Sequence, residues 1–197
     1  MWERLAERLE GRLVVVEPLG PEHEEGLWEA AQDTEVWRCM PWHAAADRES
    51  FRRWLDEALE RGDAGLDVPF AVIESRTGAP LGSTRYLALR PEHRGLEIGW
   101  TWTARRAWGT GVNVEAKLLL LRHAFETLAC MRVEFKTDAL NMRSRAALEA
   151  LPARFEGIFR KHMLVRDGEL RDSAWYAITD DEWPAVRANL ERRLQAK

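Results

Sequence analysis

The alternation of apolar and polar positions along the chain predicts a mixture of strands and helices. A short charged helix is expected at the start, followed by a β-branched strand over residues 12–17 that Pro18 ends. Two helices are expected next, the first opened by Pro21 and the second spanning residues 47–61. In the second helix the large apolar side chains lie three and four positions apart, as in an amphipathic helix: Phe51, Trp54, Leu55 and Leu59.

The rest of the chain continues this mixed pattern. Over residues 112–128, apolar residues recur every three or four positions and predict a long helix with one buried stripe. With no repeat or linker, the elements together predict one mixed α/β domain over residues 1–197. The other expected elements are strands over 69–74, 81–89, 96–102 and 132–137, a helix over 141–151, a hairpin of 155–165 and 172–178, and a last helix over 180–194.

Composition and charge narrow the classes of function. The chain has 46% hydrophobic and 31% charged residues, a balance typical of a folded globular protein. Its net charge of −4 argues against binding to nucleic acid or to an anionic membrane. No apolar run approaches the roughly 20 residues that span a bilayer, and no signal peptide is evident, so we expect a cytoplasmic protein. Cys39 and His43 cannot complete a zinc site, and no metal is expected.

The most informative segment is residues 105–113, which lies between a predicted strand and the long helix. Gly109 and Gly111 allow a tight turn, in which consecutive backbone N–H groups can converge on one point. The N-terminal end of the following helix adds partial positive charge. Such a loop is suited to a pyrophosphate, although two glycines after a strand also occur in plain turns.

Residues 106–111 read Arg-Ala-Trp-Gly-Thr-Gly and resemble the Arg/Gln-x-x-Gly-x-Gly/Ala loop of the GNAT acetyltransferases, which binds the pyrophosphate of coenzyme A. Residues 96–100, 141–144 and 156–160 extend the resemblance over most of the chain, toward the RimJ/RimL branch, which acetylates N-terminal α-amines of ribosomal proteins. The resemblance implies a GNAT fold, with a central, mixed, mostly antiparallel twisted sheet of about seven strands flanked by helices.

The resemblance also assigns residues to the cofactor, acetyl-CoA. The parallel strands four and five, at 97–102 and 132–137, would form a V-shaped splay that holds the pantetheine arm. A backbone N–H near the middle of strand four would then face the developing oxyanion. The expected cofactor-binding residues are Trp100, Thr101, Arg106, Ala107, Trp108, Gly109, Thr110, Gly111, Asn141 and Arg143.

By the same resemblance, two side chains take part in the chemistry. Glu97 would remove a proton from the amine, directly or through water, and a solvated strand residue is the plainer alternative. Ser144 would protonate the leaving thiolate, although helix capping explains Asn141 and Ser144 equally well. An α-amine, with a pKa of about 7.7 to 8.0, needs only modest help from a base near pH 7.

The loop before the second helix is rich in large apolar groups, so Trp37 and Trp42 are expected to line an aromatic cleft for the acceptor, while most of the ten tryptophans belong to the core. Tyr176 is expected in the core as well. Asn113 and Pro152 depart from the family pattern and leave the subgroup, and therefore the acceptor, open.

These features together predict the transfer of an acetyl group from acetyl-CoA to a primary amine, by direct attack in a ternary complex. An N-terminal α-amine of a ribosomal or other protein is the first choice of acceptor, and a small-molecule amine is the second. A non-catalytic acyl-CoA sensor is the third reading, against which Glu97 argues because a sensor needs no carboxylate beside the thioester. The protein is expected to be a monomer or a homodimer.

Overall fold

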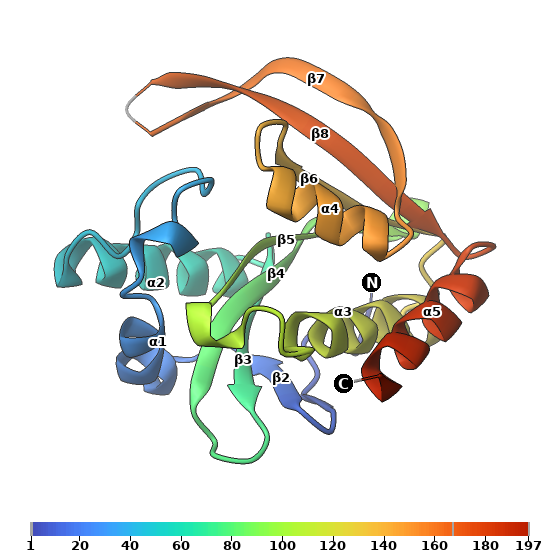
Figure 1. The fold of residues 1–197 in the computed structure, drawn as a ribbon, viewed down its shortest axis with the longest axis horizontal. Helices are drawn as coiled ribbons and strands as arrows, with labels where there is room; N and C mark the ends of the chain where they lie inside the picture. The colour runs from blue at the N-terminus through green and yellow to red at the C-terminus, as the bar shows by residue number, and fades with distance from the viewer. Residues whose placement is uncertain (1, 167, 197) are drawn as a thin grey trace.

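The computed structural model describes residues 2–166 and 168–196, which form a twisted sheet with helices on both faces (Figure 1). Within these residues, eight strands lie in the order β1-β2-β3-β4-β5-β6-β8-β7. Neighbouring strands are antiparallel except β5 and β6, which are parallel. The strands are β1 (Leu9–Glu10), β2 (Val14–Pro18), β3 (Val68–Glu74), β4 (Pro80–Arg90), β5 (Gly95–Thr103), β6 (Arg132–Asp138), β7 (Arg154–Val165) and β8 (Glu169–Thr179).

The helices divide between the two faces of this sheet (Figure 1). α1 and α2 pack on one face, while α3 and α5 lie together on the other, where α4 also contributes to the core. The α-helices are α1 (Glu24–Ala30), α2 (Arg48–Asp63), α3 (Val112–Arg122), α4 (Met142–Ala150) and α5 (Trp183–Gln195). The shorter helical turns are η1 (Pro21–His23), η2 (Thr34–Val36), η3 (Pro91–His93), η4 (Arg105–Ala107) and the π-helical turn η5 (His123–Thr127).

Strand β2 shows why the sheet needs helices on both sides. Val14 and Val16 pack into the core shared with α3 and α5, and Val15 between them packs into the core shared with α1 and α2. Because successive side chains of a strand point to opposite faces, a continuous apolar run belongs to a strand covered on both faces. The mixed α/β fold expected from the sequence is therefore confirmed, with eight strands among the described residues in place of about seven.

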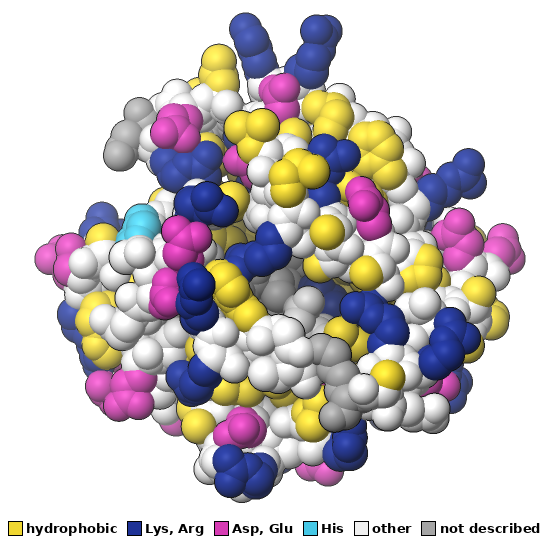
Figure 2. Space-filling model, viewed as in Figure 1, with side chains coloured by type: hydrophobic (Ala, Val, Ile, Leu, Met, Phe, Trp, Pro, Cys, Tyr) yellow, Lys and Arg dark blue, Asp and Glu magenta, His cyan; other side chains and the backbone are white. Residues whose placement is uncertain are grey.

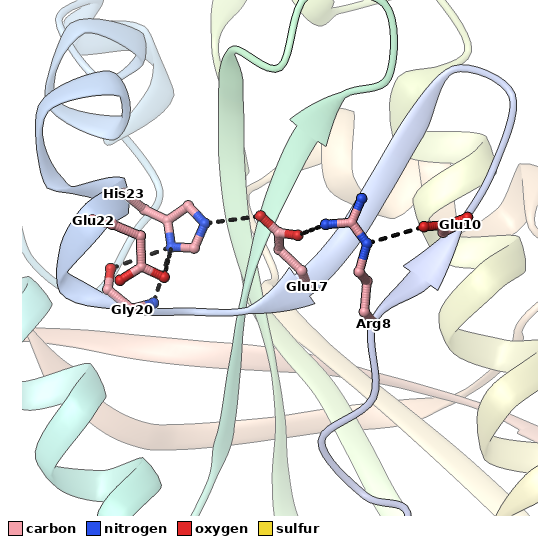
Figure 3. Close-up of polar contacts among 6 residues, drawn as sticks. All are labelled: Arg8, Glu10, Glu17, Gly20, Glu22 and His23. Carbon is pink, nitrogen blue, oxygen red and sulfur yellow. Dashed lines mark hydrogen bonds and ion pairs between the residues drawn. The ribbon is translucent and has the colours of Figure 1, made fainter.

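A chain of polar contacts fixes the first hairpin against the start of α1 (Figure 3). Glu17 accepts a hydrogen bond from Nε2 of His23 at 3.1 Å, and the Gly20 N–H donates to Nδ1 of the same ring at 3.0 Å. Glu17 also pairs with Arg8, whose Nε lies 3.1 Å from a carboxylate oxygen of Glu10. His23 is buried, so these contacts satisfy ring nitrogens that burial would otherwise leave without partners.

The prediction of a short helix at the start of the chain is wrong. The described residues before β1 contain turns and bends only, and the indole Nε1 of Trp2 donates to the carbonyl oxygen of Leu128 at 2.8 Å. A helix of a few residues is marginal without tertiary support, and this contact holds the segment along the end of the long helix instead. The long helix itself continues from α3 into a π-helical turn, where the Leu128 N–H donates to the carbonyl oxygen of His123 at 3.0 Å.

Glu115 joins α3 to the turn between β1 and β2. Its carboxylate is buried and accepts three backbone N–H groups, from Arg12 at 3.1 Å, Leu13 at 2.6 Å and Val14 at 2.8 Å. These bonds satisfy the backbone donors of a turn that β-pairing does not use, and they hold the start of α3 at a fixed position on the sheet.

We predict that Glu115→Gln lowers the free energy of unfolding by about 2 to 4 kcal/mol, because an amide NH₂ would replace an acceptor that buried N–H groups require. Urea unfolding followed by circular dichroism measures the change. Glu92→Gln, at an exposed position in η3, is the control and should shift the midpoint little. Equal, small effects for the two variants would contradict the role given to Glu115.

Candidate active site

The parallel strands β5 and β6 separate partway along their length. They pair at Gly95 with Arg132, Leu96 with Val133 and Glu97 with Glu134, and within the described residues the pairing stops there. Beyond this point the backbone groups of β5 that face β6 have no ladder partner on that side. The V-shaped splay expected between these strands is present, and it opens at Glu97.

A bulge in β5 lies at the mouth of the splay. The pairing of β4 with β5 shifts between Ser83, which faces Trp102, and Arg85, which faces Gly99. Trp100 in the bulge has φ +50°, a conformation that costs a non-glycine residue about 1 to 3 kcal/mol. The guanidinium carbon of Arg85, 4.9 Å from the centre of the Trp100 ring, helps to hold this conformation. The bulge re-aims the backbone at the place where the two strands part.

A cavity of about 420 Å³ occupies the splay, lined by β5, β6, α3, α4 and the loop after α1. Figure 2 looks onto this face of the molecule, where Lys and Arg side chains surround a hollow. Ten of the fourteen expected site residues reach the lining: Glu97, Trp100, Thr101, Ala107, Trp108, Gly109, Gly111, Asn141, Arg143 and Ser144.

The loop between η4 and α3 has the conformation that the glycines were expected to provide. Gly109 has φ +77° and Gly111 has φ +103°, and among the described residues no heavy atom lies within 4 Å of a Cβ built on Gly109. Gly111 is the N-cap of α3, and it supplies no side chain that would cap the first-turn amides. The Val112 N–H donates to Oγ1 of Thr110 at 3.4 Å, so the start of α3 is partly capped from within the loop. The helix end and the glycine turn lie at the edge of the cavity, where the partial positive charge of the helix end favours an anion.

Two residues of the loop brace it and do not line the cavity. A guanidinium nitrogen of Arg106 donates to the carbonyl oxygen of Pro80 at 3.2 Å, and the Thr110 hydroxyl donates to that of Ala107 at 2.7 Å. Their side chains thus help to fix the turn.

α4 brings a cation and two polar groups to the same edge. The Arg143 guanidinium carbon lies 3.4 Å from the centre of the Trp108 ring, so the two groups stack. Asn141 Oδ1 accepts the Ser144 N–H at 3.0 Å, which confirms Asn141 as the cap of α4. The cap uses the side-chain amide oxygen of Asn141 and the backbone N–H of Ser144. The Ser144 side chain is not part of the cap, and Ser144 lines the cavity.

Glu97 is almost completely buried, with 1% of its surface exposed, so it is no solvated strand residue. Its Oε2 accepts a hydrogen bond from Nζ of Lys136 at 3.0 Å. Burial raises the pKa of Glu97 above its ordinary value of 4.5, and the nearby Lys136 ammonium only partly offsets this. A carboxylate of this kind has a higher proton affinity than one in water, which suits a general base.

Lys117 on α3 is a site residue that the sequence did not reveal. It is buried, lines the cavity, and donates from Nζ to Oγ1 of Thr101 at 2.9 Å. Burial lowers the pKa of Lys117 from 10.5 to about 7, so a large share of its amine is neutral near pH 7. A signal was available, because Lys117 lies three positions after Val114 and four before Leu121 on the apolar stripe of the helix.

Trp37 and Trp42 were expected to line the acceptor cleft, and the structure does not place them there. Trp37 is 1% exposed and packs against Trp54 and Trp102, with its Nε1 donating to the carbonyl oxygen of Ala31 at 2.9 Å. Trp42 is half-buried against the same core. Large rings remove much apolar area from water when they enter the core, and smaller neighbours in this loop reach the cavity instead: Val36, Cys39, Met40 and Pro41.

One further position agrees with the sequence. Tyr176 is fully buried, and its hydroxyl accepts a hydrogen bond from Nε of Arg145 at 3.1 Å, so Tyr176 is a core residue. Within residues 2–166 and 168–196, no cluster of three or more metal-binding side chains is found. None of the helices in that part of the chain has the length and apolar character of a membrane span.

Known proteins of similar sequence and structure share this architecture. A family profile for the acetyltransferase (GNAT) domain matches residues 12–154. The structure of a T. thermophilus protein described as an acetyltransferase has 42% sequence identity to this chain, covers 95% of this chain and 97% of its own, and has a TM-score of 0.86. A GCN5-related N-acetyltransferase from Brucella melitensis is 31% identical, over 95% and 85% of the two chains, with a TM-score of 0.88.

More distant structures agree in fold. Mycobacterium smegmatis RimJ, in a complex with CoA-disulfide, is 22% identical over 95% of each chain, with a TM-score of 0.78, a likeness that establishes the shared fold only. No curated protein sequence matches this chain significantly. The family profile and the two relatives above 30% identity carry the assignment: the chain belongs to the GNAT family and is an N-acetyltransferase.

Proposed function

We propose that this protein transfers an acetyl group from acetyl-CoA to a primary amine, and that its first-choice acceptor is an N-terminal α-amine, as in the RimJ/RimL branch. The observation that carries the proposal is the splay of β5 and β6, which opens at the buried carboxylate of Glu97 and faces the glycine loop at the start of α3. The candidate base, the gap between the two strands and the candidate phosphate-binding loop thus surround one cavity.

The residues around the cavity fit acetyl-CoA. The loop at Gly109 and Gly111 would hold the pyrophosphate with backbone donors, and Arg143 would add a cation beside it. Asn141 has its amide nitrogen left for the pantetheine arm, since its oxygen caps α4. When bound there, acetyl-CoA would supply an activated acetyl thioester within the splay.

The chain's own groups divide the proton transfers between them. Glu97 would accept a proton from the amine, directly or through water, as nitrogen bonds to the acetyl carbon. Backbone N–H groups at Trp100 and Thr101, re-aimed by the bulge, would donate to the carbonyl oxygen as it gains negative charge. Ser144 would donate a proton to the sulfur when the carbon–sulfur bond breaks, so that the products are an amide and a thiol.

A small-molecule amine is the second candidate acceptor, and one observation favours it. The Arg166 N–H donates to the carbonyl oxygen of Pro41 at 2.8 Å, and its guanidinium donates to that of Met40 at 3.0 Å. These bonds join the end of β7 to the loop after α1, across the side of the cavity on which Glu97 lies. Such a bridge restricts the approach of a large acceptor.

We predict that Gly109→Ala raises the KM for acetyl-CoA about tenfold, because a side chain at φ +77° strains the loop and moves its amides by enough to cost roughly 1.4 kcal/mol. Steady-state kinetics with varied acetyl-CoA measures this. Gly78→Ala is the matched control, because Gly78 has φ +74° and equally open surroundings in the turn between β3 and β4. An equal change of KM in both variants would count against a cofactor seat at this loop.

We predict that Glu97→Gln lowers kcat/KM about a hundredfold, within the usual range for loss of a general base. An assay of free-thiol release, run with peptides and small amines, measures it. For the native enzyme the rate should rise with pH as Glu97 loses its proton, with a midpoint above 4.5, and Glu97→Gln should lack this rise.

Glu60→Gln, at an exposed position of α2, should behave as the native enzyme in this assay. If acetyl-CoA binds but no acceptor on the panel gives thiol release, the protein is an acyl-CoA sensor and the proposed transfer is wrong.

A further inference from the structure

Arg171 on β8 is a buried cation that forms no direct ion pair with a described residue. It is 6% exposed and lines the cavity, and its Nε has no hydrogen-bond partner among the described residues. Asp138 and Glu97 attract Arg171 electrostatically, but each carboxylate pairs directly with another cation, Glu97 with Lys136 at 3.0 Å and Asp138 with Arg166 at 3.4 Å. The Nε donor of Arg171 is therefore buried at the cavity wall without a described partner.

This arrangement is energetically unusual. A guanidinium stays charged in proteins, and a buried charge is normally paired and hydrogen-bonded because desolvation otherwise destabilises the fold. Its planar fork of donors matches a carboxylate, with which it can form two parallel hydrogen bonds. The side chain that completes such a pair is absent from the described residues around Arg171, so an anionic group of a ligand is the partner that its chemistry selects.

Arg171 lies on the opposite face of the sheet from the candidate phosphate-binding loop. On β8, Ala174 and Tyr176 pack into the core with α3, so the alternate residues, Arg171 and Trp175, point to the opposite face. Lys136 lies on that face too, with Nζ 5.5 Å from the centre of the Trp175 ring. The phosphate loop leads into α3, on the other side.

Glu97 shares the face of Arg171. Its neighbours Leu96 and Ile98 pack into the core with α3, which directs Glu97 to the opposite side, where it meets Lys136. Burial lowers the pKa of Arg171, while the carboxylates of Asp138 and, more weakly, Glu97 raise it, so both carboxylates act on it electrostatically. The proposed base thus has Lys136 beside it and shares this face of the sheet with Arg171, on the side from which an acceptor would come.

The cavity is cationic although the protein is acidic. The net charge of the chain is −4, and Glu97 is the single acidic residue among the described cavity-lining residues. Arg143 and Lys117 lie toward the loop and α3, where they serve the cofactor side. The lining residues with basic side chains are Lys117, Lys136, Arg143, Arg171 and Arg193.

We infer that Arg171, with Lys136 beside it, binds a carboxylate carried by the acceptor, so that the acceptor is a primary amine with a carboxylate a few atoms from its nitrogen. This inference rests on the proposed function. Binding of the carboxylate at Arg171 would hold the amine next to Glu97, and the transfer itself is the one described above. Free amino acids and peptides that begin with Asp or Glu share this chemistry.

The test compares acceptors that differ only in this charge. The pairs are alanine with alaninamide, and two peptides that differ only in an N-terminal Asp or Asn. We expect Arg171→Gln to lower kcat/KM at least tenfold for a carboxylate member and less than twofold for its amide partner, with the KM for acetyl-CoA unchanged. Arg171→Lys should retain part of the preference.

Arg160→Gln, at an exposed position of β7, is the control and should leave kcat/KM unchanged for both members of each pair. A preference confined to the free amino acids identifies a small acceptor, and one confined to the peptides identifies a protein N-terminus. Equal losses for both members of each pair would overturn the inference while leaving amine acetylation intact. A preference for succinyl-CoA over acetyl-CoA with every acceptor would also overturn the inference, because the carboxylate bound at Arg171 would then belong to the acyl donor.

If no acceptor gives thiol release, the proposed function fails, and calorimetric titration of malonate into the CoA-saturated protein decides the inference separately. Binding that is lost in Arg171→Gln and kept in Arg160→Gln would support a carboxylate site. No binding by the native protein would overturn it.

Discussion

The separation of β5 from β6 is the constraint on which the rest of the site depends. Two parallel strands that paired along their full length would fill the space between α3 and α4 with ladder hydrogen bonds and leave no channel. Here the pairing ends at Glu97 and Glu134, and the strained bulge at Trp100 turns the backbone where the strands part. The cavity, the carboxylate at its wall and the glycine loop at its edge all follow from this one break in the sheet.

Burial around this break sets the electrostatics of the site. Glu97 is desolvated strongly enough to raise its pKa despite the ion pair with Lys136, and Lys117 is desolvated enough to lower its pKa to about 7. Both groups therefore change charge more readily near neutral pH than they would in water. Arg171 cannot respond in this way, because a guanidinium keeps its charge, and so it is the group for which we infer an anion from outside the chain.

Local signals in the sequence were enough for most of the fold and for half of the site. The glycine loop, the α4 cap and the apolar stripe of α3 depend on neighbours within a few positions, and each was found where it was expected. Contacts between distant segments were not predictable in this way. Trp2 reaches the carbonyl of Leu128 in place of an opening helix, and Trp37 is drawn into the core. The roles of Lys117 and Arg171 depend on which strands and helices meet at the cavity. The spacing of residues along the chain does not predict this.

If the splay and the glycine loop together receive the cofactor, coenzyme A should change hydrogen exchange in both. We expect coenzyme A to slow amide exchange in residues 98–103 and 108–113, while exchange in the paired strands β2 and β3 stays unchanged. Binding of coenzyme A that leaves both segments exchanging at their original rates, with protection elsewhere, would contradict it.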